Sequence, residues 1–185
     1  NYLFAKKHSG TFILRIEDTD QSRFVPGAEE YIVESLNWLN IPFDEGPGAG
    51  GASGPYRQSE RKALYQDYAL QLIEQGWAYY AFDSAEALDE SRKSEEAKGN
   101  TFIYNWHNRG GLDNSLCMTS KELSDRLRSA PNYVIRFKWP ENETLVFSDI
   151  IRGDLRIDTN TLDDKVLYKS DGMPTYHLAN VVDDH

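Results

Sequence analysis

The sequence predicts an α/β fold that is interrupted by an insertion. Over residues 1–82, helical and strand patterns follow one another in the order helix, strand, helix, helix, strand. From about residue 83 the chain changes to polar helices, loops and short strands, and a strand and a helix follow after residue 164. We therefore expect 1–82 to be the first part of one domain, 83–164 an inserted module, and 165–185 the return to that domain.

The composition is that of a folded globular protein. Of 185 residues, 39% are hydrophobic and 27% are charged. No stretch reaches the roughly 20 apolar residues of a membrane helix, and no cleavable signal is visible, so we expect no membrane association. A single cysteine, Cys117, forms neither an internal disulfide nor a cysteine-based zinc site, which fits a cytoplasmic location. The chain begins without Met, in what reads as the end of a helix, so we expect a piece of a longer protein.

The first elements follow from periodicity and from helix-ending residues. The pattern predicts a helix over 1–8, ended by Ser9-Gly10, and a strand over 11–17 with alternating side chains. Pro26-Gly27 opens a second helix, which Ile41-Pro42 ends.

A loop and a further helix come next. Residues 46–55 are rich in glycine and proline and predict a loop, although 46–51 fit the weak pattern G-x-G-x-x-G. Ser59 is the expected cap of the next helix and Gly76 its end. Residues 77–82 predict a strand.

The remaining elements belong to the expected insertion and to the return segment. We predict helices over 84–99 and 120–129, the second capped by Ser120, and strands over 132–139, 143–153, 154–158 and 165–170. A final helix begins near Thr175.

Two polar clusters are candidate binding groups. Glu17 lies at the end of a predicted strand, where open α/β sheets bind ligands, and its carboxylate suits an ammonium group or a cation. Equally, Glu17 and Asp18 could pair with Arg15, with Arg23 or with the start of the next helix. Tyr176 and Asn180 are four residues apart and share one helix face, which suits a small polar ligand. The alternative is a core tyrosine and a solvated amide.

Three stretches together carry a resemblance to a known family. They read FILRIEDTDQSRFVPGAEEYIVESLNWLNI (12–41), GPYRQSERKALYQDYALQLIEQGWAY (54–79) and LYKSDGMPTYHLANVVDDH (167–185). In this order they resemble bacterial-type glutamyl-tRNA synthetases, which are class I aminoacyl-tRNA synthetases. The resemblance is dense over 1–82 and 133–185 and weak between them.

The resemblance implies a fold and a reaction. The fold is a Rossmann-like catalytic domain, incomplete here, that is interrupted by a mixed α/β insertion binding the tRNA acceptor stem. The reaction joins L-glutamate to ATP, with Mg²⁺, as glutamyl-adenylate and transfers glutamate to the 3′ end of tRNA(Glu). The family resemblance further implies a cytoplasmic monomer, and the single cysteine excludes the four-cysteine zinc cluster of some relatives.

The resemblance also assigns roles to residues. Glu17 would hold the α-ammonium of glutamate, and Tyr176 and Asn180 would line the same pocket. Arg57, Arg152 and Lys169 resemble positions that face the tRNA acceptor end. No catalytic residue is assigned, because the family's HIGH-type and KMSKS-type motifs lie outside these residues, so we expect the chain alone to be inactive.

Other readings stay open at this point. A glutamine-charging relative, or one that loads glutamate onto a modified tRNA base, would share the fold, although glutamine enzymes usually show DDTN where this chain has EDTD. A synthetase-like module without catalysis is a third possibility. The formal net charge of −10 requires tRNA binding to use a local basic face. Its expected members are Arg126, Arg128, Arg136, Lys138, Arg152, Arg156, Lys165 and Lys169.

Overall fold

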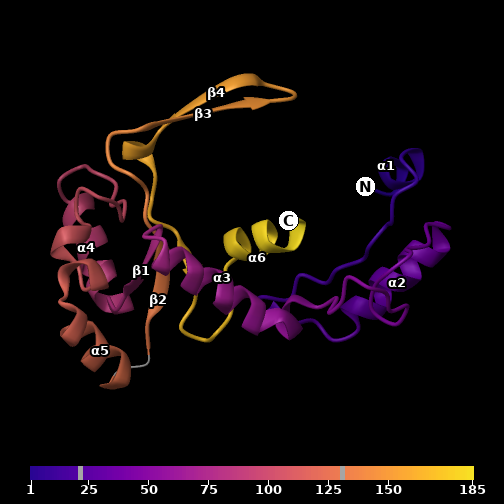
Figure 1. Ribbon diagram of the computed structural model, residues 1–185, viewed down its shortest axis with the longest axis horizontal. Coiled ribbons are helices and arrows are strands. Elements are labelled where there is room, and N and C mark those ends of the chain that lie inside the picture. Colours follow the sequence, from indigo (N-terminus) through magenta and orange to yellow (C-terminus); the bar gives the residue numbers. More distant parts are fainter. Residues whose placement is uncertain (21–22, 130–131) are drawn as a thin grey trace. The chain divides into compact units, whose positions relative to one another are not determined.

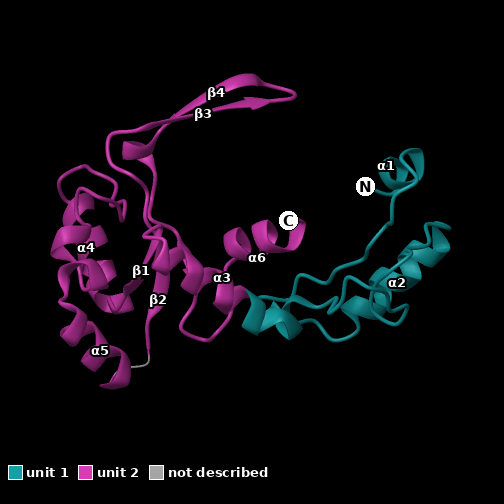
Figure 2. Cartoon of the chain, in the orientation of Figure 1, with its two compact units in different colours: residues 1–64 teal, residues 65–185 magenta. Residues whose placement is uncertain are grey.

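The computed structural model describes residues 1–20, 23–129 and 132–185. The chain forms two compact units, residues 1–64 and residues 65–185, shown in different colours in Figure 2. Helices and short strands are mixed along the chain, as an α/β sequence pattern predicts (Figure 1).

Helices dominate unit 1. They are α1 (Tyr2–Lys7), α2 (Ala28–Trp38) and the 3-10 turn η2 (Gln58–Arg61), and α3 (Lys62–Glu74) begins in this unit and continues into unit 2. The predictions of a helix at the start and of a helix after Pro26-Gly27 are confirmed. The second helix ends at Trp38, a few residues before the expected stop.

The predicted strand over 11–17 is not formed as a continuous strand. Two isolated parallel bridges stand in its place, Ile13 with Glu45 and Ile16 with Arg57. The extended segment changes its partner along its length, so no ladder of consecutive pairs develops. The second bridge places residue 57 beside the chain that leads into Glu17.

The two ends of the helix predicted between Ser59 and Gly76 have different outcomes. Ser59 is not the cap of α3, because it lies inside η2, where its amide donates to Asp18 Oδ1 at 2.8 Å. The expected end at Gly76 is confirmed. Gly76 has φ +80°, and the amide of Trp77 donates to the carbonyl of Leu72 at 2.8 Å, as in a Schellman motif.

Unit 2 is built on a three-stranded antiparallel sheet in the order β1-β2-β5. The strands are β1 (Ala78–Ala81), β2 (Val134–Phe137) and β5 (Val166–Tyr168). Each strand comes from a different one of the three segments expected from the sequence. The remaining elements of the unit are α4 (Ala85–Glu96), η3 (Arg109–Gly111), η4 (Ser115–Cys117), α5 (Ser120–Ser129), β3 (Thr144–Asp149), β4 (Gly153–Asp158), η5 (Thr159–Thr161) and α6 (Tyr176–Asp184).

Both faces of this sheet are covered. On one face, Ala78 of β1 packs in a core with residues of α3, β2, β5 and α6, namely Tyr65, Ala69, Ile135, Leu167, Tyr168, Leu178 and Ala179. On the other face, Tyr79 and Ala81 pack with Tyr104, and Leu88 of α4 lies against them. Because successive side chains of a strand point to opposite faces, this two-sided burial explains the nearly unbroken apolar run of residues 77–82.

The cap of α5 differs from the expected one. Thr119, not Ser120, occupies the capping position. The amide of Glu122 donates to Thr119 Oγ1 at 3.3 Å, and the amide of Thr119 donates to Glu122 Oε2 at 2.7 Å. This reciprocal pair is a capping box, which the spacing Thr-x-x-Glu in the sequence could have revealed.

Strands β3 and β4 form a hairpin that extends away from the sheet (Figure 1). Asp149 Oδ1 accepts hydrogen bonds from the amides of Ile151 and Arg152 at 2.9 and 2.8 Å, which order the turn. The side chains of Ile150 and Ile151 at its tip are fully exposed. The predicted strand over 143–153 therefore ends at Asp149, where the turn begins.

In the described ranges of the chain, we find no helix with both the length and the hydropathy to cross a lipid bilayer.

Candidate functional site

A pocket of ≈ 600 Å³ lies within unit 1, where the segment 14–18 meets the start of α2. Its wall is apolar at residues such as Phe24 and Ile32 and charged elsewhere. The acidic residues that line it are Glu17, Asp18, Asp20 and Glu29, and the basic ones are Arg15, Arg23 and Arg57. The structure thus brings Glu17 and Arg57, both predicted from the sequence, to one cavity.

Three of the four carboxylates in this pocket are engaged by the protein itself. Asp18 accepts the amide of Ser59, as described above. Asp20 Oδ2 accepts from Arg23 Nε at 2.6 Å. Glu29 is held by Arg57. The two contacts with arginine also compensate the negative charges of Asp20 and Glu29.

Glu17 is the exception. Its side chain is exposed, and among the described residues no hydrogen bond or ion pair to it is found. Among the described residues, Glu17 is found paired with neither Arg15 nor Arg23, and Arg23 instead binds Asp20. An unpaired carboxylate at the wall of a pocket suits a cationic ligand group.

Arg57 joins two helices of unit 1. Its Nε and Nη2 donate to the two carboxylate oxygens of Glu29 at 2.8 and 2.5 Å, and its Nη1 donates to Glu60 Oε1 at 2.9 Å. The pairing with Glu29 is bidentate, the geometry that best suits a guanidinium and a carboxylate. Hydrogen bonding to Glu29, followed by that to Glu60, raises the pKa of the Arg57 guanidinium.

The pair of Glu29 with Arg57 predicts that the stability of unit 1 decreases at acid pH. The hydrogen bond from Arg57 lowers the pKa of Glu29 below its ordinary value of 4.5. A lowered folded-state pKa means that the pair contributes its full stabilisation above pH 4.5 and loses it as the pH falls through the folded value. We expect a carboxyl ¹³C NMR titration to place the Glu29 midpoint below 4.5, and the midpoint in Arg57→Met at or above 4.5. Equal midpoints in the two proteins would contradict the pairing.

The other predicted glutamate ligands lie on α6 in unit 2. Tyr176 is its first residue and is 58% exposed, and Asn180 is partly buried one turn later. Asn180 Nδ2 donates to Asp184 Oδ2 at 3.3 Å. Residues on the adjacent face, Leu178 and Ala179, anchor the helix in the core. The reading of Tyr176 as a core tyrosine is wrong, because its ring is exposed. Whether it shares a cavity with Glu17 stays a prediction.

The two other predicted tRNA ligands are also in unit 2. Arg152 lies in the exposed turn of the β3–β4 hairpin. Lys169 follows β5, and its Nζ is 2.9 Å from Asp171 Oδ2.

Comparison with known proteins identifies the family. A sequence model of the family described as tRNA synthetases class I (E and Q), catalytic domain, matches residues 1–185. The chain belongs to this family. It is 65% identical over its whole length to the glutamate–tRNA ligases of Christiangramia forsetii and Flavobacterium johnsoniae, and it spans 37% of the length of each.

Solved structures agree with this assignment. The crystal structure of a glutamate tRNA ligase from Elizabethkingia meningosepticum, in complex with its amino acid, matches all of this class I synthetase chain with a TM-score of 0.94 and 52% identity. The glutamate-tRNA synthetase of Elizabethkingia anophelis matches with a TM-score of 0.93. The chain covers 37% of each of those chains. The class I synthetase catalytic-domain fold predicted from the sequence is therefore confirmed.

The basic face expected of this synthetase chain is only partly present. The prediction that Arg136 belongs to this basic face is wrong, because Arg136 is buried and its guanidinium lies 3.9 Å from the ring centroid of Tyr104. Four others form ion pairs with acidic neighbours, namely Arg126 with Asp113, Arg128 with Asp125, Lys165 with Asp163 and Lys169 with Asp171. For Arg152 and Arg156 on the hairpin, no ion pair is found among the described residues.

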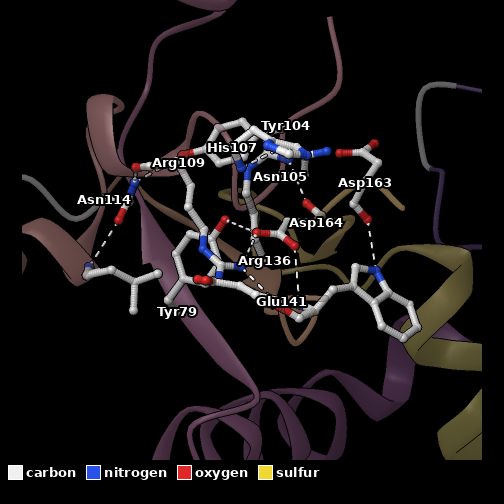
Figure 3. Close-up of polar contacts among 12 residues, drawn as sticks. Tyr79, Tyr104, Asn105, His107, Arg109, Asn114, Arg136, Glu141, Asp163 and Asp164 are labelled. Atoms are coloured by element: carbon white, nitrogen blue, oxygen red, sulfur yellow. Dashed lines mark hydrogen bonds and ion pairs between the residues drawn. The ribbon is translucent and has the colours of Figure 1, made fainter. Parts of the chain in front are cut away.

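A buried polar network, which sequence reasoning missed, joins the segment after β2 to the segment before β5 (Figure 3). Asp164 is fully buried. Its Oδ2 accepts from Tyr79 Oη at 2.8 Å and from Arg109 Nη1 at 3.1 Å. Burial, with the Asp164 carboxylate nearby, raises the pKa of Tyr79. The residues of the network are far apart in sequence, so no short sequence pattern predicts it.

Proposed function

We propose that the chain is part of the catalytic domain of a glutamate–tRNA ligase. The ligase activates L-glutamate with ATP to glutamyl-adenylate and transfers glutamate to the 3′ end of tRNA(Glu) in protein synthesis. The relatives from Christiangramia forsetii and Flavobacterium johnsoniae, each 65% identical to this chain, are both named glutamate–tRNA ligases, which supports glutamate over glutamine as the amino acid. The proposal includes a cytoplasmic location and a monomeric protein.

Glu17 carries the proposal at the level of residues. It is a carboxylate at a pocket wall with no partner among the described residues, and the pocket of ≈ 600 Å³ is large enough for an amino acid. An α-ammonium group that leaves water for this pocket needs an anion beside it, and Glu17 supplies that charge. Tyr176 and Asn180 are proposed, from the resemblance alone, as further ligands of the same amino acid.

In this reaction the protein orients groups more than it reacts. The carboxylate of glutamate is itself the nucleophile that attacks the α-phosphate of ATP, and the bond between the α- and β-phosphates breaks to release pyrophosphate. Holding the α-ammonium at Glu17 fixes the direction of the adjoining carboxylate and so lowers the entropic part of the barrier. ATP and Mg²⁺ enter the proposal as co-substrate and its metal ion, and we assign none of their ligands to the described residues.

The division of the chain into three segments is also proposed from the sequence pattern and the family resemblance. Residues 1–82 and 165–185 would belong to a Rossmann-like domain and 83–164 to an acceptor-stem module. The exposed arginines of the β3–β4 hairpin support a nucleic-acid contact there, since phosphates bind accessible guanidinium groups. Arg152 is accordingly the strongest of the proposed tRNA ligands.

The test is glutamate-dependent exchange of pyrophosphate into ATP by the full-length protein that contains this chain, with tRNA present. We expect exchange with glutamate and no more than background with glutamine. The 185-residue chain alone is expected to show no exchange. Exchange that prefers glutamine, or none with either amino acid, would overturn the proposal.

A further inference from the structure

Arg57 is placed differently from a residue that binds a phosphate. All three nitrogens of its guanidinium are within hydrogen-bond distance of protein carboxylates, two at Glu29 and one at Glu60. Its side chain is 40% exposed and that of Glu29 is 28% exposed, so the pair is partly shielded from water. These bonds use three of the five N–H donors, and two carboxylates already compensate the positive charge, which weakens the attraction of Arg57 for a nucleic-acid phosphate.

The backbone around Arg57 is tied to the segment that carries Glu17. Gln58 N donates to the carbonyl of Ile16 at 3.0 Å, and Ser59 N donates to Asp18 Oδ1 at 2.8 Å. These two bonds flank Glu17 in the sequence. The Arg57 side chain fixes residues 57–59 to α2 through its bond to Glu29. The position of Glu17 therefore depends on where residues 57–59 are held.

The charge of the pocket points the same way. Glu29 lines the pocket together with Glu17. If Arg57 did not pair with Glu29, the cavity would present two unpaired carboxylates, and a ligand with a single ammonium group could compensate only one of them.

We propose that Arg57 is a positioning residue for amino-acid binding, which neutralises Glu29 and anchors residues 57–59 so that Glu17 alone is presented to the α-ammonium group. This inference rests on the proposed function of Glu17. It replaces the role of tRNA ligand that the resemblance implied for Arg57.

Steady-state kinetics of the full-length protein test the proposal. Arg57→Met is expected to raise KM for glutamate by about tenfold, while kcat and KM for tRNA change by less than about twofold. Adding Glu29→Gln to R57M removes the uncompensated carboxylate, so the double variant is expected to have a lower KM for glutamate than R57M. The matched control for glutamate binding is Lys93→Met, which breaks the exposed pair of Lys93 with Asp89 on α4 and should leave KM for glutamate unchanged.

A second measurement does not depend on activity. We expect amide hydrogen exchange at Gln58 and Ser59 to be faster in R57M than in wild type, and unchanged in K93M. Unchanged exchange at both amides, or a KM increase for tRNA without one for glutamate, would overturn the proposal. If the wild-type protein shows no glutamate-dependent exchange of pyrophosphate into ATP, the proposed function fails. Amide hydrogen exchange would then still decide whether Arg57 anchors residues 57–59.

Discussion

Substitution of Asp164 by alanine is expected to lower the free energy of unfolding of unit 2 by about 3–5 kcal/mol. Asp164 is 0% exposed, and Arg109, whose side chain is 7% exposed, is its ion-pair partner at 3.1 Å. Among the described residues, the substitution leaves that guanidinium with one carboxylate partner, Glu141, which is 54% exposed, and with the carbonyl of Trp139 at 3.2 Å. It also leaves the Tyr79 hydroxyl without its acceptor. An uncompensated buried charge is among the costliest of single changes.

Urea denaturation measured by far-UV circular dichroism and by tryptophan fluorescence would test this, because Trp139 lies in the network and its amide donates to Asp164 Oδ1 at 3.2 Å. Asp125→Ala is the matched control. It removes an exposed carboxylate that pairs with Arg128 on α5, and we expect a change of less than about 0.5 kcal/mol. A loss below about 1 kcal/mol for D164A would mean that the network is not the support we describe. If D164A does not fold, Asp164→Asn, which keeps an acceptor for Tyr79, should fold with a smaller loss.

Substitution of Glu17 by glutamine is expected to lower kcat/KM for glutamate by about 100-fold in the full-length protein. The amide keeps the size of the side chain and removes the charge that opposes the α-ammonium group. Because Glu17 has no partner among the described residues, the change should not alter thermal stability. Activity loss with an unchanged unfolding temperature therefore identifies a ligand-binding role.

Two further variants sharpen this test. Glu17→Asp keeps the charge and withdraws it by one methylene, so its activity should lie between those of wild type and E17Q. Glu30→Gln is the matched control, since Glu30 is an exposed carboxylate on α2 outside the pocket lining. Equal glutamate KM values in wild type and E17Q would exclude Glu17 as the ammonium ligand.

Local chemistry explains which elements the sequence predicted well. The helix ending at Gly76 was predictable because its left-handed end depends on the conformational freedom of one glycine. The strand β1 was predictable because its apolar residues are contiguous. The charge of Glu17 at the end of an extended segment marked it as a ligand candidate without any knowledge of its neighbours.

Contacts between distant segments explain the errors. The segment 11–17 has a strand-like pattern. Whether it forms a ladder depends on how many consecutive residues of a neighbouring segment pair with it, and here it makes one bridge with Glu45 and one with Arg57. Arg136 reads as a surface cation within a polar module, whereas its guanidinium is buried over Tyr104 and donates to the carbonyl of Asp164 at 2.9 Å. Neither the missing ladder nor the burial of Arg136 can be predicted from the residues adjacent in sequence.

The sequence by itself determined the family, most element positions and the candidate role of Glu17, because these depend on local residue type, spacing and order. Only the tertiary structure decided which charges are satisfied. It showed that Arg57 is bound by Glu29, 28 residues away, and that Arg109 is bound by Asp164, 55 residues away. An ion pair forms where folding brings two groups within a few ångströms, and that distance is a property of the folded chain, not of its sequence spacing.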